Sequence, residues 1–494
     1  MIYPELEKVR ELAGGGEYKR IPVSTEIYSD SRTPIEVLRI IKRITKHCYI
    51  LESVEDRTNW GRYTFLGYDP TLEITCRHGH LKMHCCGTEF SEDTNDPAKY
   101  IRKILADNKS PKIAGLPPFT GGLVGYFSYE YLGYSEPSLD LEAEDEEKFN
   151  DVDLMLFENV IAFDNYRQKI VLIANIRVDD PNELSNEYEK GIMRLRNMAS
   201  LIRDGEPAES EPLQLKTPFR EMFSREQYCA MVEKGKNFIR EGDIFQVVLS
   251  NRLEAEYEGS LIDAYRVLRT VNPSPYMFYF SGQDVEMTGA SPETLVKLKD
   301  GELRTFPLAG TRPRGSTEEE DEALEKDLLS DGKELAEHNM LVDLGRNDIG
   351  KIAKIGSVEV ESFHKIEKFS HVMHIGSTVR GKLAEGKDAL NVIDAILPAG
   401  TLSGAPKIRA CEIIKELEGC KRGIYGGAVG YIDLAGNLDT CIGIRLAFAK
   451  NGKLFVRSGA GIVYDSEPKK EYLECRNKAQ AVIDAIETAE GGID

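Results

Sequence analysis

The chain has 494 residues, 41% of them hydrophobic, which is enough to bury a large core and predicts one very large or two ordinary globular domains. Its 63 Lys and Arg residues against 83 Asp and Glu residues give a formal net charge of −20, which disfavours nucleic acid or an anionic membrane as a partner. The nine cysteines form no zinc-like CxxC pairs, no signal segment is evident, and the longest apolar run, residues 170–176, is far too short to span a bilayer. We therefore expect a cytoplasmic protein that needs a locally placed cation to bind any anionic substrate.

The first part of the chain alternates strand-like runs with turns. Strands are expected near Cys48 and Arg62, as a hairpin over residues 72–85, and over residues 153–164 and 169–176. A charged helix follows at about residues 182–203. Residues 205–218 contain three prolines and no apolar periodicity, which indicates a linker. The predicted organisation is an N-terminal region, 1–204, the linker, 205–218, and a catalytic region, 219–494.

The second region opens with a strong helix signal. Ser224 and Gln227 form a capping-box pattern, apolar residues recur at helical spacing, and Gly242 ends the run. Strands are expected next at residues 243–257 and 276–280 and in a hairpin that turns at Asp300 and Gly301. Helices are expected at residues 261–270, 388–397 and 407–417. A three-stranded meander is expected over residues 426–463. The predicted fold class is α+β, with largely antiparallel sheets packed as a sandwich and helices outside.

A glycine-rich segment occurs twice, as GGLVGY from Gly121 and GGAVGY from Gly426. Glycine inside a strand marks close backbone approach, so we expect tight packing at the first copy, and either packing or a ligand at the second. Neither copy is a dinucleotide fingerprint or a phosphate-binding loop, which need different spacings. Kinase and dehydrogenase functions therefore lose support.

Two helices carry paired glutamates on the side that also holds apolar residues. Glu334 and Glu337 share a face with Leu341, and Glu471 and Glu474 share a face with Val482 and Lys478 at about 100° per residue. Buried carboxylates are costly unless paired or bound to a cation, so four of them on core-facing stripes indicate a site for a hard ion such as Mg²⁺. The alternative from periodicity alone is two ordinary helices whose glutamates reach solvent or form salt bridges.

The motifs of the second region identify a family. They are, in chain order, GASPETLVK from Gly289, PLAGTRPRG from Pro307, KELAEHNMLVDLGRND from Lys333, VMHIGS from Val372, PAGTLSGAPK from Pro398, YGGAVGYID from Tyr425, IGIRLAF from Ile442, RSGAG from Arg457 and ECRNKAQAV from Glu474. These segments resemble the chorismate-utilising enzymes, and the resemblance covers essentially the whole chain. The chain is most similar to the branch that makes anthranilate and pyruvate from chorismate and ammonia, in tryptophan biosynthesis.

Two positions separate the branches of this family. Where isochorismate and salicylate synthases have a lysine that activates water, this chain has Gln246. Where bacterial aminodeoxychorismate synthases have a nucleophilic lysine in PxKGT, it has Ala309. The resemblance therefore implies that ammonia is the nucleophile. A synthase that stops at 2-amino-2-deoxyisochorismate shares both positions and stays open, as does aminodeoxychorismate synthase.

The resemblance also implies roles for individual residues. Glu337 and Glu474 would hold Mg²⁺, with Glu334 and Glu471 as outer support. Glu293 is the candidate acid for the departing hydroxyl, and His374 the catalytic histidine, as base or positioner. Arg445 and Tyr425 would bind the enolpyruvyl carboxylate. The substrate-binding set implied by the resemblance is Gly310, Thr311, Thr401, Tyr425, Arg445, Gly459, Ala460, Gly461 and Lys478.

A regulatory pocket is implied by two further segments. ILES, at residues 50–53, is similar to the LLES motif with which the family binds tryptophan as a feedback inhibitor, although Ile replaces its first Leu. The partner segment NPSPYMFY begins at Asn272. The residues expected to bind tryptophan are Ser53, Pro275, Tyr276 and Met277.

The ammonia has to come from elsewhere, because no cysteine lies in a G-x-C-x-G nucleophile elbow. A separate glutamine amidotransferase subunit and a hetero-oligomer are therefore expected. A non-enzymatic amino-acid sensor that kept the fold is the rival interpretation from another class; it would have lost the metal or carboxylate contacts, and Glu337, Glu474, Arg445 and Tyr425 are all present.

Overall fold

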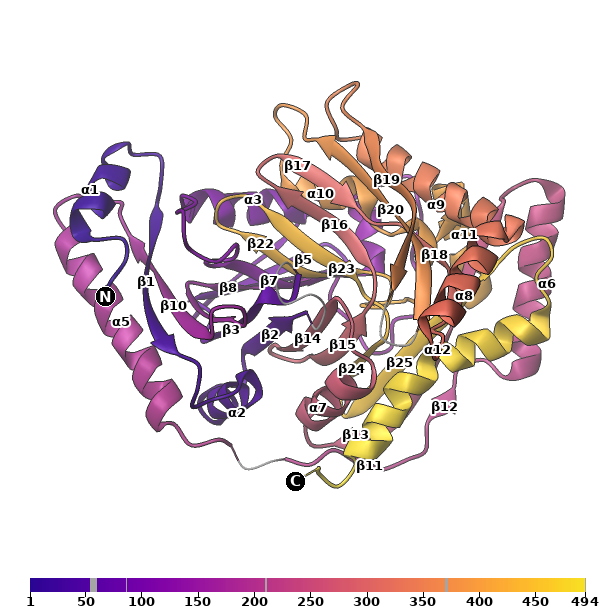
Figure 1. The fold of residues 1–494 in the computed structure, drawn as a ribbon, viewed down its shortest axis with the longest axis horizontal. Helices are drawn as coiled ribbons and strands as arrows, with labels where there is room; N and C mark the ends of the chain where they lie inside the picture. The colour runs from indigo at the N-terminus through magenta and orange to yellow at the C-terminus, as the bar shows by residue number, and fades with distance from the viewer. Residues whose placement is uncertain (54–59, 86, 209–210, 369–371, 494) are drawn as a thin grey trace.

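The computed structural model describes residues 1–494 except 54–59, 86, 209–210, 369–371 and 494. Its described strands form two large sheets, one of 13 strands and one of 12, and every pairing between named strands is antiparallel. Both sheets contribute side chains to one apolar core, including Phe278 and Phe280 from the larger sheet and Leu123 and Val296 from the smaller. The predicted antiparallel sandwich is confirmed (Figure 1).

The larger sheet joins the first and last parts of the chain. Its strands, in spatial order, are β1 (Arg20–Tyr28), β10 (Lys169–Arg177), β9 (Asn159–Asp164), β3 (Tyr63–Tyr68), β2 (Cys48–Glu52), β14 (Tyr276–Ser281), β15 (Glu286–Ser291), β24 (Leu446–Lys450), β25 (Lys453–Ile462), β13 (Gln246–Glu258) and β11 (Gln214–Leu215), with β12 (Arg220–Glu221) and β21 (Gly404–Ala405) also paired to β13. The β2–β14 pair unites the regions on either side of residues 205–218.

The smaller sheet also joins the first and last parts of the chain. Its order is β18 (Leu308–Pro313), β20 (Val372–Lys382), β17 (Glu302–Thr305), β16 (Thr294–Lys299), β23 (Leu438–Ile442), β22 (Ala428–Asp433), β7 (Gly122–Phe127), β8 (Val152–Phe157), β4 (Leu72–Arg77), β5 (His80–Cys85) and β6 (Thr88–Asp93), with β19 (Glu359–Lys368) paired to β20. The repeated glycine segments form the β7–β22 pair, with Gly125 opposite Gly430. A Cβ at either glycine would lie 2.0–2.1 Å from a neighbouring backbone oxygen, so both copies permit close strand packing.

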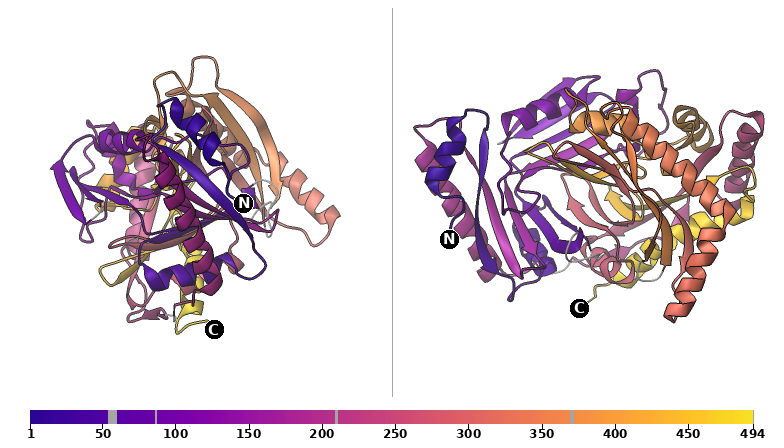
Figure 2. Two further views of the ribbon diagram at one scale, coloured as in Figure 1. Left: turned by 90° about the vertical axis from the view of Figure 1, so that its left-hand side faces the viewer. Right: turned by 45° about the horizontal axis from the view of Figure 1, so that its top comes forward.

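The helices lie against the outer faces of the sheets. They are α1 (Leu6–Gly14), α2 (Pro34–Ile44), α3 (Pro97–Asp107), α4 (Leu132–Ser135), α5 (Leu184–Asp204), α6 (Arg225–Glu241), α7 (Ile262–Val271), α8 (Glu318–Ser330), α9 (Gly332–Gly350), α10 (Ala389–Ile396), α11 (Lys407–Glu418) and α12 (Pro468–Ala489), with short 3₁₀ turns at Trp60–Arg62, Tyr129–Tyr131 and Gly400–Leu402. Helix α5 runs along β1 and β10 at the edge of the molecule, which the views of Figures 1 and 2 show. Within the described residues, no helix has the length and apolar character needed to cross a membrane.

Sequence signals that depend on a few neighbouring residues, such as helix caps and hairpin turns, predicted the structure correctly. The Ser224 hydroxyl accepts a hydrogen bond from the backbone N–H of Gln227, and the side-chain oxygen of Gln227 accepts one from the backbone N–H of Ser224. Gly242 ends α6 in the left-handed conformation. The hairpins β4–β5 and β16–β17 also form as predicted.

Two predicted groups of strands are wrong for the same reason, because each is divided between the two sheets. The strand expected over residues 153–164 divides at Glu158 into β8 and β9, which belong to different sheets. The three-stranded meander divides likewise, because β22 and β23 lie in the smaller sheet while β24 and β25 lie in the larger. At the second crossing the chain turns through Arg445, whose φ of 51° is unusual for a residue with a side chain. Arg445, which the expected meander over residues 426–463 includes, therefore lies outside both strands.

Candidate active site

The two glutamate helices reach the same place from different sheets. Helix α9 packs on β18 and β20 of the smaller sheet, and helix α12 packs on β25 of the larger sheet. Beside α12 an open hollow of about 410 Å³, the Arg445 hollow, is lined by Arg445, Lys470, Leu473, Glu474, Asn477 and Lys478. Of the residues that the family resemblance singled out, Arg445, Glu474 and Lys478 line it.

Arg445 is the main cation of the hollow. It makes no ion pair or side-chain hydrogen bond with any residue that the structure describes, and burial lowers the pKa of its guanidinium. A partly buried guanidinium without a counter-ion is costly, and a carboxylate that binds at two points is its best partner. Its position between β23 and β24 holds the side chain at the junction of the two sheets.

Tyr425 and the glycines of β25 form a close-fitting wall. Tyr425 is buried, and a Cβ added to Gly459 would lie 2.8 Å from its hydroxyl oxygen. A Cβ added to Gly461 would lie 2.6 Å from the side-chain nitrogen of Gln246. Because only glycine fits at these positions, the backbone from Gly459 to Gly461 can approach a ligand closely. Ala460, between them, is buried in the neighbouring core.

Lys478 links this wall to the glutamates. Its ammonium donates to the carbonyl oxygen of Gly459 at 3.3 Å and pairs with Glu474 at 2.8 Å. Helix α12 thereby places a cation and a carboxylate next to the glycine wall.

The four glutamates are not buried in the core, so that part of the sequence prediction is wrong. Glu337 and Glu474 are exposed, and Glu334 and Glu471 are half-buried. The apolar residues that share their faces, such as Leu341 and Val482, are buried because they lie further along each helix, where it packs on the protein.

The carboxylates of the two helices are close enough to repel each other. Although the Glu337 side chain is exposed, the protein around its carboxyl group removes part of its hydration, and this and the charges of Glu334 and Glu474 raise its pKa. The pKa of Glu471 is raised by burial and by Glu474. In the described part of the chain, no three His, Cys, Asp or Glu side chains come together closely enough to hold a metal ion by themselves. Two facing carboxylates still fit Mg²⁺, which is usually held by one or two carboxylates while waters and substrate oxygens complete its shell.

His374 lies on β20 opposite β18. Its Nδ1 is 2.9 Å from the carbonyl oxygen of Gly310 and 3.0 Å from the hydroxyl of Thr311. Burial and then the nearby Arg445 charge lower the pKa of His374 against the effect of the Gly310 hydrogen bond, so the ring is held neutral. Because a carbonyl oxygen can only accept, Nδ1 carries the hydrogen and Nε2 is the basic nitrogen. Gly310 has a φ of 67°, and a Cβ added to it would lie 3.2 Å from a carboxylate oxygen of Glu334. The strand β18 therefore packs closely on helix α9 at this point.

Glu293 is a carboxyl group with a raised pKa. It follows β15 and accepts a hydrogen bond of 3.0 Å from the Thr401 hydroxyl. Burial raises the pKa of Glu293 to about 7, although Thr401 and Lys478 act to lower it. Its proton is therefore easily gained and lost near neutral pH.

The four residues expected to bind tryptophan lie elsewhere. Ser53, Pro275, Tyr276 and Met277 all line one cavity of about 490 Å³, the Ser53 cavity, between β2, β14 and the strands β16, β22 and β23. Its other lining residues are Leu51, Glu52, Tyr63, Phe65, Lys112, Pro118, Phe278, Lys297, Leu298, Lys299, Arg304, Phe306, Val429, Gly430, Tyr431, Asn437, Leu438, Asp439 and Cys441. The hydroxyl of Ser53 is buried without a hydrogen-bond partner among the described residues.

Sequence reasoning missed the charged groups behind the site. Glu418, Arg422 and Arg457 form a buried ion network, and Lys407 pairs with Asp348 at 2.9 Å in the interior. Arg457 stands in the RSGAG motif, but no periodicity of the sequence shows that its partners come from helix α11 and the loop after it.

Comparisons with known proteins place the chain in a family. The family model of the chorismate binding enzymes matches residues 46–484. Anthranilate synthase component 1 of Acetivibrio thermocellus is 43% identical over 99% of both chains, and that of Pseudomonas aeruginosa is 44% identical over 99% of both chains.

Solved structures show the same relationship. Anthranilate synthase component I from Streptococcus pneumoniae matches with a TM-score of 0.72 and 37% identity, covering 92% of this chain and 98% of that chain. The menaquinone-specific isochorismate synthase of Escherichia coli, with a TM-score of 0.69, 18% identity and 97% and 98% coverage, shares the fold. The chain belongs to the family of chorismate-binding enzymes.

Proposed function

We propose that the chain is the synthase subunit of an anthranilate synthase, which converts chorismate and ammonia to anthranilate and pyruvate. The observation that carries this proposal is Arg445, a partly buried guanidinium without a counter-ion among the described residues, beside a glycine wall and two glutamate helices. Chorismate is a dianion, so it fits a site with one free guanidinium and one place for a divalent cation. The relatives named above supply the choice of reaction.

Substrate binding uses the two ends of the hollow. Arg445 and the Tyr425 hydroxyl bind the enolpyruvyl carboxylate, and the backbone N–H groups of the glycine wall add donors. Gly310, Thr311 and Thr401 line the ring. Glu337 and Glu474 would hold magnesium, which when bound neutralises the ring carboxylate, while Glu334 and Glu471 steady the ligands.

The proton transfers fall to two side chains with suitable pKa values. Glu293, whose pKa is about 7, donates a proton to the carbon-4 hydroxyl as it leaves and ammonia attacks carbon 2. His374, neutral and basic at Nε2, then removes the proton from carbon 2, so that pyruvate departs and the ring becomes aromatic.

Regulation and ammonia supply complete the proposal. Tryptophan would bind in the Ser53 cavity and inhibit the enzyme, and a separate glutamine amidotransferase subunit would deliver ammonia in a hetero-oligomer. The name "component 1" of the relatives is consistent with a second component.

The test is a fluorescence time course of anthranilate release from chorismate, with ammonium at alkaline pH and with Mg²⁺ or EDTA. We expect magnesium-dependent anthranilate formation with ammonium, and almost none when glutamine is the only nitrogen donor. Consumption of chorismate without anthranilate would favour a synthase that stops at 2-amino-2-deoxyisochorismate or one with another nucleophile. Absence of consumption would refute the proposed enzyme and favour the sensor.

A further inference from the structure

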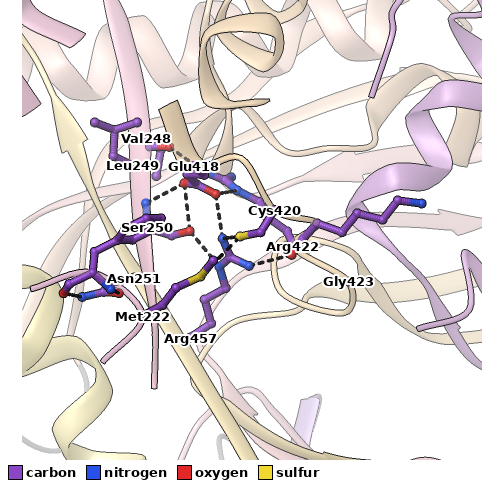
Figure 3. Close-up of polar contacts among 12 residues, drawn as sticks. Met222, Val248, Leu249, Ser250, Asn251, Glu418, Cys420, Arg422, Gly423 and Arg457 are labelled. Atoms are coloured by element: carbon purple, nitrogen blue, oxygen red, sulfur yellow. Dashed lines mark hydrogen bonds and ion pairs between the residues drawn. The ribbon is translucent and has the colours of Figure 1, made fainter. Parts of the chain in front are cut away.

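A buried ion network lies behind the glycine wall. Glu418, at the end of α11, receives hydrogen bonds from Arg422 at 2.6 and 2.9 Å and from Arg457 at 2.7 Å. Ser250 donates to Glu418 at 2.9 Å through its hydroxyl and accepts from Arg457 at 2.9 Å. Figure 3 shows both guanidinium groups turned toward the one carboxylate. The side chains of Glu418 and Arg457 are 0% exposed and that of Arg422 is 1% exposed.

The network contains two cations and one anion. Burial alone would raise the pKa of Glu418, but Arg422 and Arg457 hold its pKa below the ordinary value, so the carboxyl is ionised. The next carboxyl group, Glu130, accepts hydrogen bonds from the backbone N–H groups of Arg422 and Gly423 rather than from the guanidiniums. One positive charge is therefore in excess within the network, in an interior where charges are weakly screened.

Tyr425 and Gly459, which belong to the proposed carboxylate site, both lie next to this network. Tyr425 is three residues beyond Arg422, and the guanidinium carbons of Arg422 and Arg457 lie 5.8 and 6.0 Å from the centre of its ring. Arg457 is two residues before Gly459 on β25, and Ser250 is paired with Gly459 across β13 and β25. The network therefore contacts both Tyr425 and the strand that carries Gly459. These two residues have to stay in contact for the site to keep its shape.

We infer that Arg422 and Arg457 are positioning residues, which hold Tyr425 against Gly459 and place their excess positive charge behind the binding site for a substrate carboxylate. This inference rests on the proposed function, because it names how the same site binds chorismate. Neither arginine needs to touch the substrate. Their effect is expected in affinity rather than in the chemical step.

The test replaces one arginine of the pair. Arg457→Met removes the excess charge and leaves Glu418 paired with Arg422, so the carboxylate is not left alone in the interior. We expect KM for chorismate to rise about tenfold while kcat stays within about threefold. The dissociation constant of chorismate, measured by calorimetry with Mg²⁺ present, should rise by the same factor.

The matched control is a buried arginine far from the site. Arg20, on β1, pairs with Glu158 at 2.8 Å, and their side chains are 4% and 11% exposed. Arg20→Met should lower Tm as Arg457→Met does but leave KM for chorismate unchanged. If Arg457→Met lowers Tm and leaves KM and the dissociation constant unchanged, the network is merely structural and the inference is overturned.

A second variant decides the matter if Arg457→Met does not fold. Arg457→Lys keeps the charge but cannot reproduce the fork that joins Ser250 and Glu418, so we expect a smaller rise in KM, about threefold. A folded Arg457→Lys protein with unchanged KM and lowered Tm would overturn the inference. Failure of the wild-type chain to bind chorismate would instead refute the proposed function.

Discussion

The Arg445 hollow and the Ser53 cavity differ in the state of their charged groups. In the hollow, Arg445 has no counter-ion among the described residues, and the carboxylates of Glu334 and Glu474 add to the rise in the pKa of Glu337. In the cavity, the charged lining residues Glu52 and Asp439 are already paired, with Arg269 and with Lys297. The cavity is also lined by aromatic side chains, including Tyr63, Phe65 and Tyr431.

This difference is consistent with the proposed roles of the hollow as a reactive site and of the cavity as a binding site. Catalysis by proton transfer needs a group whose pKa lies near the working pH, and Glu293, with a pKa of about 7, is such a group. Satisfied ion pairs and aromatic walls suit recognition of an aromatic ligand instead. The predictions below test this division of roles, beginning with the largest effect.

Glu293→Gln should lower kcat by about 10²- to 10⁴-fold with little change in KM, because the amide cannot donate the proton that the leaving hydroxyl needs. The wild-type carboxyl, with a pKa of about 7, is protonated below that pH and loses its proton above it. At a fixed concentration of free ammonia, kcat should therefore fall as pH rises through about 7. Thr401→Val removes a hydrogen bond that lowers this pKa, so it should move the fall to higher pH. A kcat profile that stays flat through this range in both proteins would contradict the role of Glu293 as acid.

Arg445→Ala should reduce kcat/KM by about 10²- to 10³-fold, because two charge-assisted hydrogen bonds to the carboxylate are lost. Arg445→Lys keeps the charge without the planar fork and should lose less. Steady-state kinetics with chorismate measures both, and Tm should not fall, since Arg445 has no partner in the described structure to lose. A wild-type kcat/KM in Arg445→Ala would remove the carboxylate-binding assignment.

The sequence predicted the residues of the hollow better than their surroundings. Three of the residues singled out from motif order, Arg445, Glu474 and Lys478, line the hollow, and the capping box of Ser224 is local enough to be read directly. The crossing of β23 to β24 between sheets depends on what packs on either side, so nothing in IGIRLAF signals that Arg445 leaves the strand. Helical periodicity placed the glutamates on apolar faces, but it cannot show which turns of a helix pack on the rest of the protein and which turns extend beyond it.

Glu474→Gln should raise the magnesium concentration for half-maximal activity by at least about tenfold, because one of two carboxylate ligands is lost. Addition of EDTA should abolish turnover in wild type and variant alike. Titration of MgCl₂ into the chelator-treated protein is the measurement. Equal magnesium dependence in the two proteins would place the metal elsewhere.

Ser53→Phe should have the smallest effect on catalysis, with kcat/KM for chorismate within about twofold of wild type. The phenyl ring fills the Ser53 cavity, so inhibition by tryptophan should be lost. Initial rates at increasing tryptophan concentration test this. Unchanged inhibition in the variant would remove the pocket assignment.

The most direct test of the division into two sites is a calorimetric titration of chorismate and of tryptophan into wild type, Arg445→Ala and Ser53→Phe, with Mg²⁺ present. The account predicts that Arg445→Ala loses chorismate binding and keeps tryptophan binding, whereas Ser53→Phe does the reverse. Loss of both ligands in either folded variant, or tryptophan binding that depends on Arg445 alone, would contradict it.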